Sequence, residues 1–185
     1  MDKAHFYEEE IKKDLKRVSK IQIENWRNKA LENQDYLDAA LRIGLTNEKP
    51  YCWRCSWVIS KVAMKDKTRV MAFTNQIIDK LELFRFDSQI GGFLKTLSLV
   101  DNYEESKMGY LADYCIKIIY DKNRPSYNKY YAIQVLLIIA GKFRELAREF
   151  ALVIEQNLPY FEKPYLKRFG KTAMLKLNKN DGMVE

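Results

Sequence analysis

The pair Cys52-x-x-Cys55 is the pattern in this chain that could most readily do chemistry. Two thiols at this spacing form a redox pair when they begin a helix after a strand, or half of a zinc site when two further ligands follow at similar spacing. Cys115 stands alone, and no β–α–β pattern precedes the pair. Both thiols also share a helical stripe with Ile59 and Val62. We therefore expect them to be buried, reduced and without metal.

Other groups that could act as acids, bases or ligands do not converge in the sequence. The single histidine, His5, lies among charged residues near the N-terminal end, where we expect it to be exposed. The carboxylate runs 8–10 and 104–105 diverge on a helix, because successive residues are rotated by about 100°. The glycine pair 91–92 lacks the preceding strand that a phosphate-binding loop needs. We predict no catalytic residue, no metal site and no cofactor.

Two tyrosines and two charged residues could form a binding surface on the helix expected at 103–121. These residues, on the side opposite its apolar stripe, are Tyr110, Asp113, Tyr114 and Lys117. In stacked helix pairs the second helix commonly lines the binding surface, and tyrosine offers a large contact area with few rotamers to freeze. The alternative is that Tyr110 and Tyr114 pack on a neighbouring helix, and the sequence leaves both interpretations open.

The C-terminal third of the chain is basic and could bind an acidic partner. Residues 124–185 hold 11 Lys and Arg against 6 Asp and Glu, in a chain of net charge +7. The set that could bind nucleic-acid phosphates is Arg144, Arg148, Lys163, Lys167, Arg168 and Lys171. Glu145 and Glu149 interrupt it, whereas a dedicated DNA surface should be more uniformly basic.

Helices must position all of these residues. Apolar residues at helical spacing recur in the stretches 70–81, 108–119 and 147–158, about 38 residues apart. A fixed period of this size is typical of stacked helix pairs, since one pair cannot bury its own apolar face. We expect an all-α fold of about nine or ten helices, stacked as a short right-handed α-α superhelix.

The expected helices cover most of the chain. Their ranges are 2–33 with a break near Ser19, a short helix from Tyr36 that ends near Gly44, and then 48–65, 67–84, 87–100, 103–121, 126–140, 143–158 and 162–178. Asn102 and Glu105 resemble a capping box. The small residues at matching places, which should let helices approach closely, are Ser56, Gly92, Ala132 and Gly170. We predict one domain, with capping helices in 1–46, repeats in 47–178 and a flexible tail in 179–185.

The period, the helix pairs and the small residues resemble HEAT or armadillo-type repeats over about residues 47–178. The stretch 52–62 is also similar to the pattern Cys-Arg-Ala-Ala-Trp-Val-Leu-Glu of short bacterial HEAT-like proteins: Arg54, Trp57 and Val58 match, while Cys55 and Ser56 replace the two alanines. Some of those proteins are named adenylosuccinate lyase. The lyase is much larger, and its flexible Ser-Ser-x-Met-Pro-x-Lys loop has no counterpart here. The resemblance implies a HEAT/ARM-like solenoid.

Composition agrees with a folded helical protein. Of 185 residues, 47% are apolar and 31% charged, and only 7 Gly and 4 Pro are present, which favours long helices. The sequence contains no run of 18 apolar residues, which is about the length that a membrane-spanning helix needs. The first ten residues lack the apolar core of a signal peptide, so we expect a cytoplasmic location. We predict a non-catalytic module that binds another protein, with nucleic-acid binding as the alternative.

Overall fold

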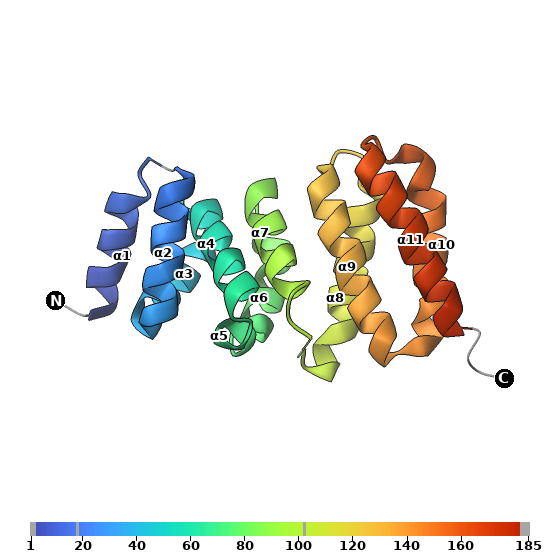
Figure 1. Cartoon of the computed structure of the whole chain (residues 1–185), viewed down its shortest axis with the longest axis horizontal. Helices are drawn as coiled ribbons and strands as arrows, with labels where there is room; N and C mark the ends of the chain where they lie inside the picture. The colour runs from blue at the N-terminus through green and yellow to red at the C-terminus, as the bar shows by residue number, and fades with distance from the viewer. Residues whose placement is uncertain (1–2, 18, 102, 182–185) are drawn as a thin grey trace. The chain divides into compact units, whose positions relative to one another are not determined.

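The computed structural model describes residues 3–17, 19–101 and 103–181. Within these ranges it contains eleven α-helices, three short 3-10 helices and no strand, which confirms the all-α prediction. The chain divides between Asn102 and Tyr103 into two compact units (Figure 1).

The first unit is built around α4. Its helices are α1 (Lys3–Asp14), α2 (Lys20–Glu32), α3 (Gln34–Gly44), α4 (Tyr51–Lys65), α5 (Thr68–Met71), α6 (Thr74–Lys80), the 3-10 helix η1 (Leu81–Leu83) and α7 (Asp87–Leu97). Helix α4 packs against α2 and α7 as well as against α3, and α3 packs in turn against α1. Helices α2, α3 and α4 thus contact both a neighbour in sequence and a more distant helix, as stacked helix pairs do.

The second unit repeats this packing. Its helices are α8 (Glu105–Tyr120), α9 (Ser126–Lys142), η2 (Arg144–Leu146), α10 (Ala147–Asn157), η3 (Leu158–Tyr160) and α11 (Pro164–Asp181). Helices α9 and α11 pack side by side, α8 packs against α10, and each helix also contacts its sequence neighbour. Two layers of helices therefore bury the apolar stripes between them, as predicted for a repeat solenoid.

Two helix boundaries show how local residues set the elements. Ser19 separates α1 from α2 and caps α2 in a capping box with Gln22, which confirms the predicted break. The helix predicted at 67–84 is instead divided into α5, α6 and η1, so the helices outnumber the nine or ten expected. At the division Phe73 donates its backbone N–H to Val70, and the Thr74 hydroxyl donates to Met71, so both bonds reach back three residues instead of four.

Side chains from later in the sequence complete the ends of earlier helices in the first unit. Arg54 of α4 donates to the backbone carbonyl of Leu15 and, at 2.8 Å, to that of Lys16, just after α1. The guanidinium of Arg69 in α5 likewise donates to the carbonyl of Leu31 in the last turn of α2. The last carbonyls of a helix have no intrahelical donor, so these bonds tie neighbouring repeats together.

Some predicted features fall partly outside the described residues. Asn102, the predicted cap of α8, is one of them, and so are residues 182–185 of the predicted tail. Helix α11 extends to Asp181, three residues into the range predicted as tail. The single-domain organisation and its boundaries at 46 and 178 stay predictions.

Candidate functional site

The outer face of α8 carries three of the four residues predicted to bind a protein partner. Tyr110 is 41% exposed, and Asp113 and Lys117 are exposed as well. Tyr114 is only 5% exposed. The prediction that both tyrosines lie opposite the buried side is therefore wrong for Tyr114.

The error has a packing cause. Helix α8 packs against both α9 and α10, so it is buried over a wide arc and not along one stripe. Tyr114 lies three residues after Leu111 and four before Ile118, which are both buried, so it falls within that arc. A helical wheel drawn from the apolar residues alone indicates one buried side of α8 and does not show that a second neighbouring helix widens it.

The exposed face of α8 also includes a residue that sequence reasoning missed. Tyr120 is 46% exposed and follows Lys117 by three residues, one turn further along the same side. Its hydroxyl donates a hydrogen bond of 2.6 Å to Oε1 of Gln156 in α10, which fixes the orientation of the ring. The sequence could have indicated Tyr120, because it lies three residues after Lys117 and ten after Tyr110, which places all three on one side of a helix. We call Tyr110, Asp113, Lys117 and Tyr120 the α8 face.

The predicted burial of the cysteine pair is confirmed. Cys52, Cys55 and Cys115 are free thiols with no exposed area. Burial raises the pKa of each thiol, so all three are protonated near neutral pH. The pair does lie in the first turns of a helix, because α4 begins at Tyr51 and not at residue 48 as predicted. Burial outweighs this position, since a reactive thiolate needs exposure and a lowered pKa.

The N-terminal carboxylates make contacts between helices. Glu8 pairs with Nε of Arg42 at 2.6 Å, and Glu10 pairs with Nζ of Lys29, also at 2.6 Å. Tyr36 donates its hydroxyl to Glu10 at 3.0 Å, so this carboxylate joins α1 to both α2 and α3. His5 is exposed on α1, as expected.

In the described part of the chain, no group of three His, Cys, Asp or Glu side chains could hold a metal ion.

The six residues of the predicted nucleic-acid surface are all exposed and are spread along the packed pair α10 and α11. Arg144 lies in η2 at one end of α10, whereas Lys163 lies just after η3 at the other end. The length of α10 separates these ends by about 16 Å. Arg148 belongs to the first turn of α10. The remaining members, on α11, are Lys167, Arg168 and Lys171.

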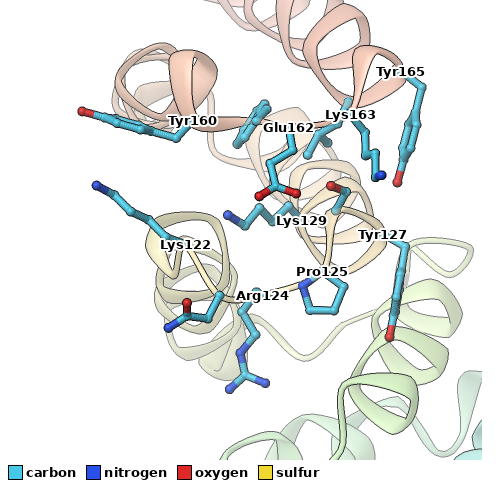
Figure 2. A pocket seen from close by; sticks show the side chains of 13 residues that line it. Lys122, Arg124, Pro125, Tyr127, Lys129, Tyr160, Glu162, Lys163 and Tyr165 are labelled. Atoms are coloured by element: carbon cyan, nitrogen blue, oxygen red, sulfur yellow. The ribbon is translucent and has the colours of Figure 1, made fainter.

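A cavity of about 480 Å³ opens within the second unit (Figure 2). Its walls are the segment 122–129, which leads from α8 into α9, and the segment 160–166, which leads from η3 into α11. Lys122 and Arg124 lie on the first wall, Tyr160 and Glu162 lie on the second, and Lys129 lies between them (Figure 2). We call this the basic cavity, because its lining includes four cationic side chains and one carboxylate among the described residues.

Lys129 is the least exposed of these charged residues, at 4%. Burial lowers the pKa of its ammonium group, while the charges of Asp121 and Glu162 act in the opposite direction. Its Nζ lies 6.0 Å from the centre of the Phe161 ring. Across the cavity, Nζ of Lys122 lies 4.3 Å from the centre of the Tyr160 ring.

A second hollow adjoins the basic cavity and is aromatic. It is also about 480 Å³ in volume, and its lining is Tyr127, Tyr130, Tyr131, Tyr165 and Phe169. Tyr127 and Tyr165 line both hollows. Tyr130 packs on Phe169 with ring centres 4.3 Å apart and on Tyr165 at 6.2 Å. We call this hollow the aromatic shelf.

Comparison with known proteins identifies the repeat. Residues 11–176 match the family described as HEAT repeat domain, which covers most of the chain. This chain belongs to the HEAT repeat family. No curated protein and no solved structure matches it. The further resemblance to bacterial proteins named adenylosuccinate lyase stays a prediction.

The HEAT match begins earlier than the predicted repeats, so α2 and α3, predicted as caps, lie within it. HEAT repeats commonly mediate contacts between proteins, and the family is typically a non-enzymatic scaffold. No helix within the described ranges has both the length and the apolar character that crossing a membrane requires. The basic cavity of this HEAT protein was missed, because the sequence does not show that the segment 160–166 packs against the segment that holds Lys122, Arg124 and Lys129.

Proposed function

We propose that this HEAT repeat protein is a non-catalytic module that binds another protein through the α8 face. The observation that carries the proposal is a line of exposed side chains on α8, in which Tyr110 and Tyr120 flank Asp113 and Lys117. The proposal retains the predicted cytoplasmic location.

The α8 face suits a protein interface for physical reasons. A tyrosine ring buries a large area on contact and loses few rotamers, which is why tyrosine is enriched where binding energy concentrates. The ring of Tyr120 is already oriented by its bond to Gln156, so little further ordering is needed on binding. Asp113 and Lys117 carry opposite charges between the rings and would select a partner of complementary pattern.

Affinity capture with double variants tests the proposal. The wild-type chain and the Tyr110→Ala/Tyr120→Ala variant are used to capture proteins from native lysate, and the captured proteins are quantified. We expect at least one partner to be depleted by about tenfold or more in the variant. Trp57→Ala is the matched control, because Trp57 is 40% exposed on α4 in the other unit and should leave that partner unaffected. Unchanged capture by the double variant would remove the α8 face from the proposal.

Nucleic-acid binding is the second candidate, and one feature of α11 favours it. Lys163, just before α11, and Lys167 and Lys171 within it recur every four residues and are exposed, so they favour one basic line along this side of the helix. This candidate function requires binding of duplex DNA or RNA that weakens steeply as salt is added. On duplex DNA, the logarithm of the binding constant should fall against the logarithm of the salt concentration with a slope near −0.9 per phosphate contact. Absence of gel retardation at micromolar concentrations in roughly 50 mM salt would dismiss it.

A further inference from the structure

We propose that the basic cavity binds a phosphate monoester and that the adjoining aromatic shelf holds the apolar part of the same molecule. This inference does not rest on the proposed function, because no residue of the α8 face lines either hollow. It rests on the charge of the cavity, on the helix ends that open into it and on one buried cation.

The lining of the basic cavity favours an anion. Lys122, Arg124, Lys129 and Lys163 line it together with one carboxylate, Glu162, and Arg124 is already paired with Asp121 at 3.1 Å, so the three lysines carry the excess of positive charge. Figure 2 shows the amine of Lys129 between the two walls, on the side of Glu162, whereas the guanidinium of Arg124 points away from it. A ligand with two negative charges would offset most of this excess, whereas a single carboxylate would leave more of it uncompensated.

Two helices also begin at this cavity. Helix α9 starts at Ser126 and α11 at Pro164, and the residues around both starts belong to the lining. The first N–H groups of a helix lack intrahelical acceptors, and the helix dipole places partial positive charge at that end. Helix starts of this kind bind phosphate groups in many proteins. Both helices are long, with 17 and 18 residues.

The buried cation is the independent observation that points to a ligand. Lys129 is 96% buried, and its amine is directed into the cavity between the two walls (Figure 2). Within the described residues, Nζ of Lys129 forms no direct ion pair: Asp121 and Glu162 act on it only through their charges, and its aromatic contact with Phe161 is long, at 6.0 Å. A buried ammonium without a counterion is costly to the fold. A bound phosphate would supply that counterion.

The aromatic shelf indicates what the phosphate is attached to. Tyr127 and Tyr165 line both hollows, so a molecule with its phosphate beside Lys129 can extend across them toward Tyr130 and Phe169. The rings are tilted or edge-on to one another, and aromatic rings in such arrangements can hold a flat apolar group by face or edge contacts. The shared chemistry is therefore a phosphate monoester of an aromatic group, carried by a free small molecule or by a side chain of a partner protein.

Calorimetric titration of the full chain tests the site. Inorganic phosphate and phenyl phosphate are the probes, at pH 7 and low salt. We expect both to bind and phenyl phosphate to bind more tightly. Lys129→Met, which keeps the side-chain shape and removes the charge, should weaken both by about tenfold or more. Lys171→Met is the control, because Lys171 is exposed on α11 and does not line the cavity.

A structural readout separates a ligand site from a folding role for Lys129. Without phosphate, Lys129→Met should unfold at the same temperature as the wild type or higher, because an unpaired buried charge is removed. Phosphate should then raise the unfolding temperature of the wild type and not that of the variant. Failure of the wild type to bind phenyl phosphate at millimolar concentration, or equal binding by both lysine variants, would overturn the proposal.

Two further titrations identify the source of the phosphate. Tighter binding of a phosphotyrosine peptide than of adenosine monophosphate would assign the site to a partner protein, and the reverse would assign it to a free nucleotide. Tyr110→Ala/Tyr120→Ala should leave all of these titrations unchanged. Loss of phosphate binding therefore bears on the basic cavity alone, and loss of partner capture by that double variant bears on the α8 face alone.

Discussion

Gly92 of α7 lies directly against Ser56 of α4. A Cβ atom added to Gly92 would stand 2.3 Å from Oγ of Ser56, 2.9 Å from its Cβ and 3.0 Å from its carbonyl carbon. Real Cβ atoms essentially never approach heavy atoms at less than 3.0 Å, so the two helices are as close as a missing side chain permits. The sequence placed both residues in the set of small residues expected at helix contacts, and the close approach is confirmed for this pair.

Replacing Gly92 by Ala should therefore destabilise the protein. The added methyl group must push α7 away from α4, and overpacking of this kind costs about 1–3 kcal/mol. Urea unfolding followed by circular dichroism measures the change. Gly109→Ala is the control, because nothing lies within 4 Å of a Cβ at Gly109 in α8. It should gain up to about 1 kcal/mol from helix propensity, and equal losses at both sites would contradict the close contact.

The two tyrosines of α8 should differ sharply when truncated. Tyr114→Ala removes a buried ring and should cost about 3 kcal/mol or more of unfolding free energy. Tyr110→Ala removes a half-exposed ring and should change stability by less than about 0.5 kcal/mol. Thermal and urea unfolding of the two single variants make the comparison. Similar losses of unfolding free energy in the two variants would contradict the difference in burial between Tyr114 and Tyr110.

The buried thiols should make stability fall at alkaline pH. Burial raises the pKa of Cys52, Cys55 and Cys115 above that in the unfolded chain, about 8.5. Above that pH the unfolded chain loses protons that the folded chain keeps, so the unfolding free energy declines by about 1.4 kcal/mol per pH unit for each such thiol. Cys52→Ala/Cys55→Ala should show a shallower decline than the wild type.

The same double variant tests the structural role of the pair. At pH 7 it should cost on the order of 1 kcal/mol per site, as a small core truncation, and leave any partner binding intact. A decline with pH as steep as that of the wild type would contradict the burial of these thiols. Stoichiometric zinc in the purified wild type would contradict the prediction that they bind no metal.

The contact between Glu10, Lys29 and Tyr36 should weaken in acid. Burial alone would raise the pKa of Glu10, but the hydrogen bonds from Lys29 and Tyr36 outweigh it and lower that pKa. The stabilisation is therefore present above the unfolded pKa, about 4.3, and is lost as pH falls through the lower folded value. Glu10→Gln should cost about 0.5–1 kcal/mol at pH 7, since the pair is partly exposed, and little at pH 3. A constant difference across this range would exclude the charge as its source.

Helices were predictable from the sequence because apolar periodicity directly reflects packing. The stretch 108–119 fits one helix and α8 follows it, and the small residues Ser56 and Gly92 marked a contact that exists. The basic cavity was not predictable in the same way. Lys129 follows Pro125 by four residues and looks like any charged residue in a first helical turn. Lys129 is buried only because the segment near residue 160 packs over it, and no local sequence pattern predicts that contact.

The capping of early helices by later side chains has a consequence for synthesis. The ribosome synthesises α1 before Arg54 and α2 before Arg69, so the carbonyls at the end of each helix lack these donors until about one further repeat has been made. The first unit therefore acquires its finished helix ends in order along the chain, each one repeat behind the growing end. A nascent chain that stops early always carries one incomplete repeat, whose exposed carbonyls and apolar stripe are what a chaperone or a protease would meet.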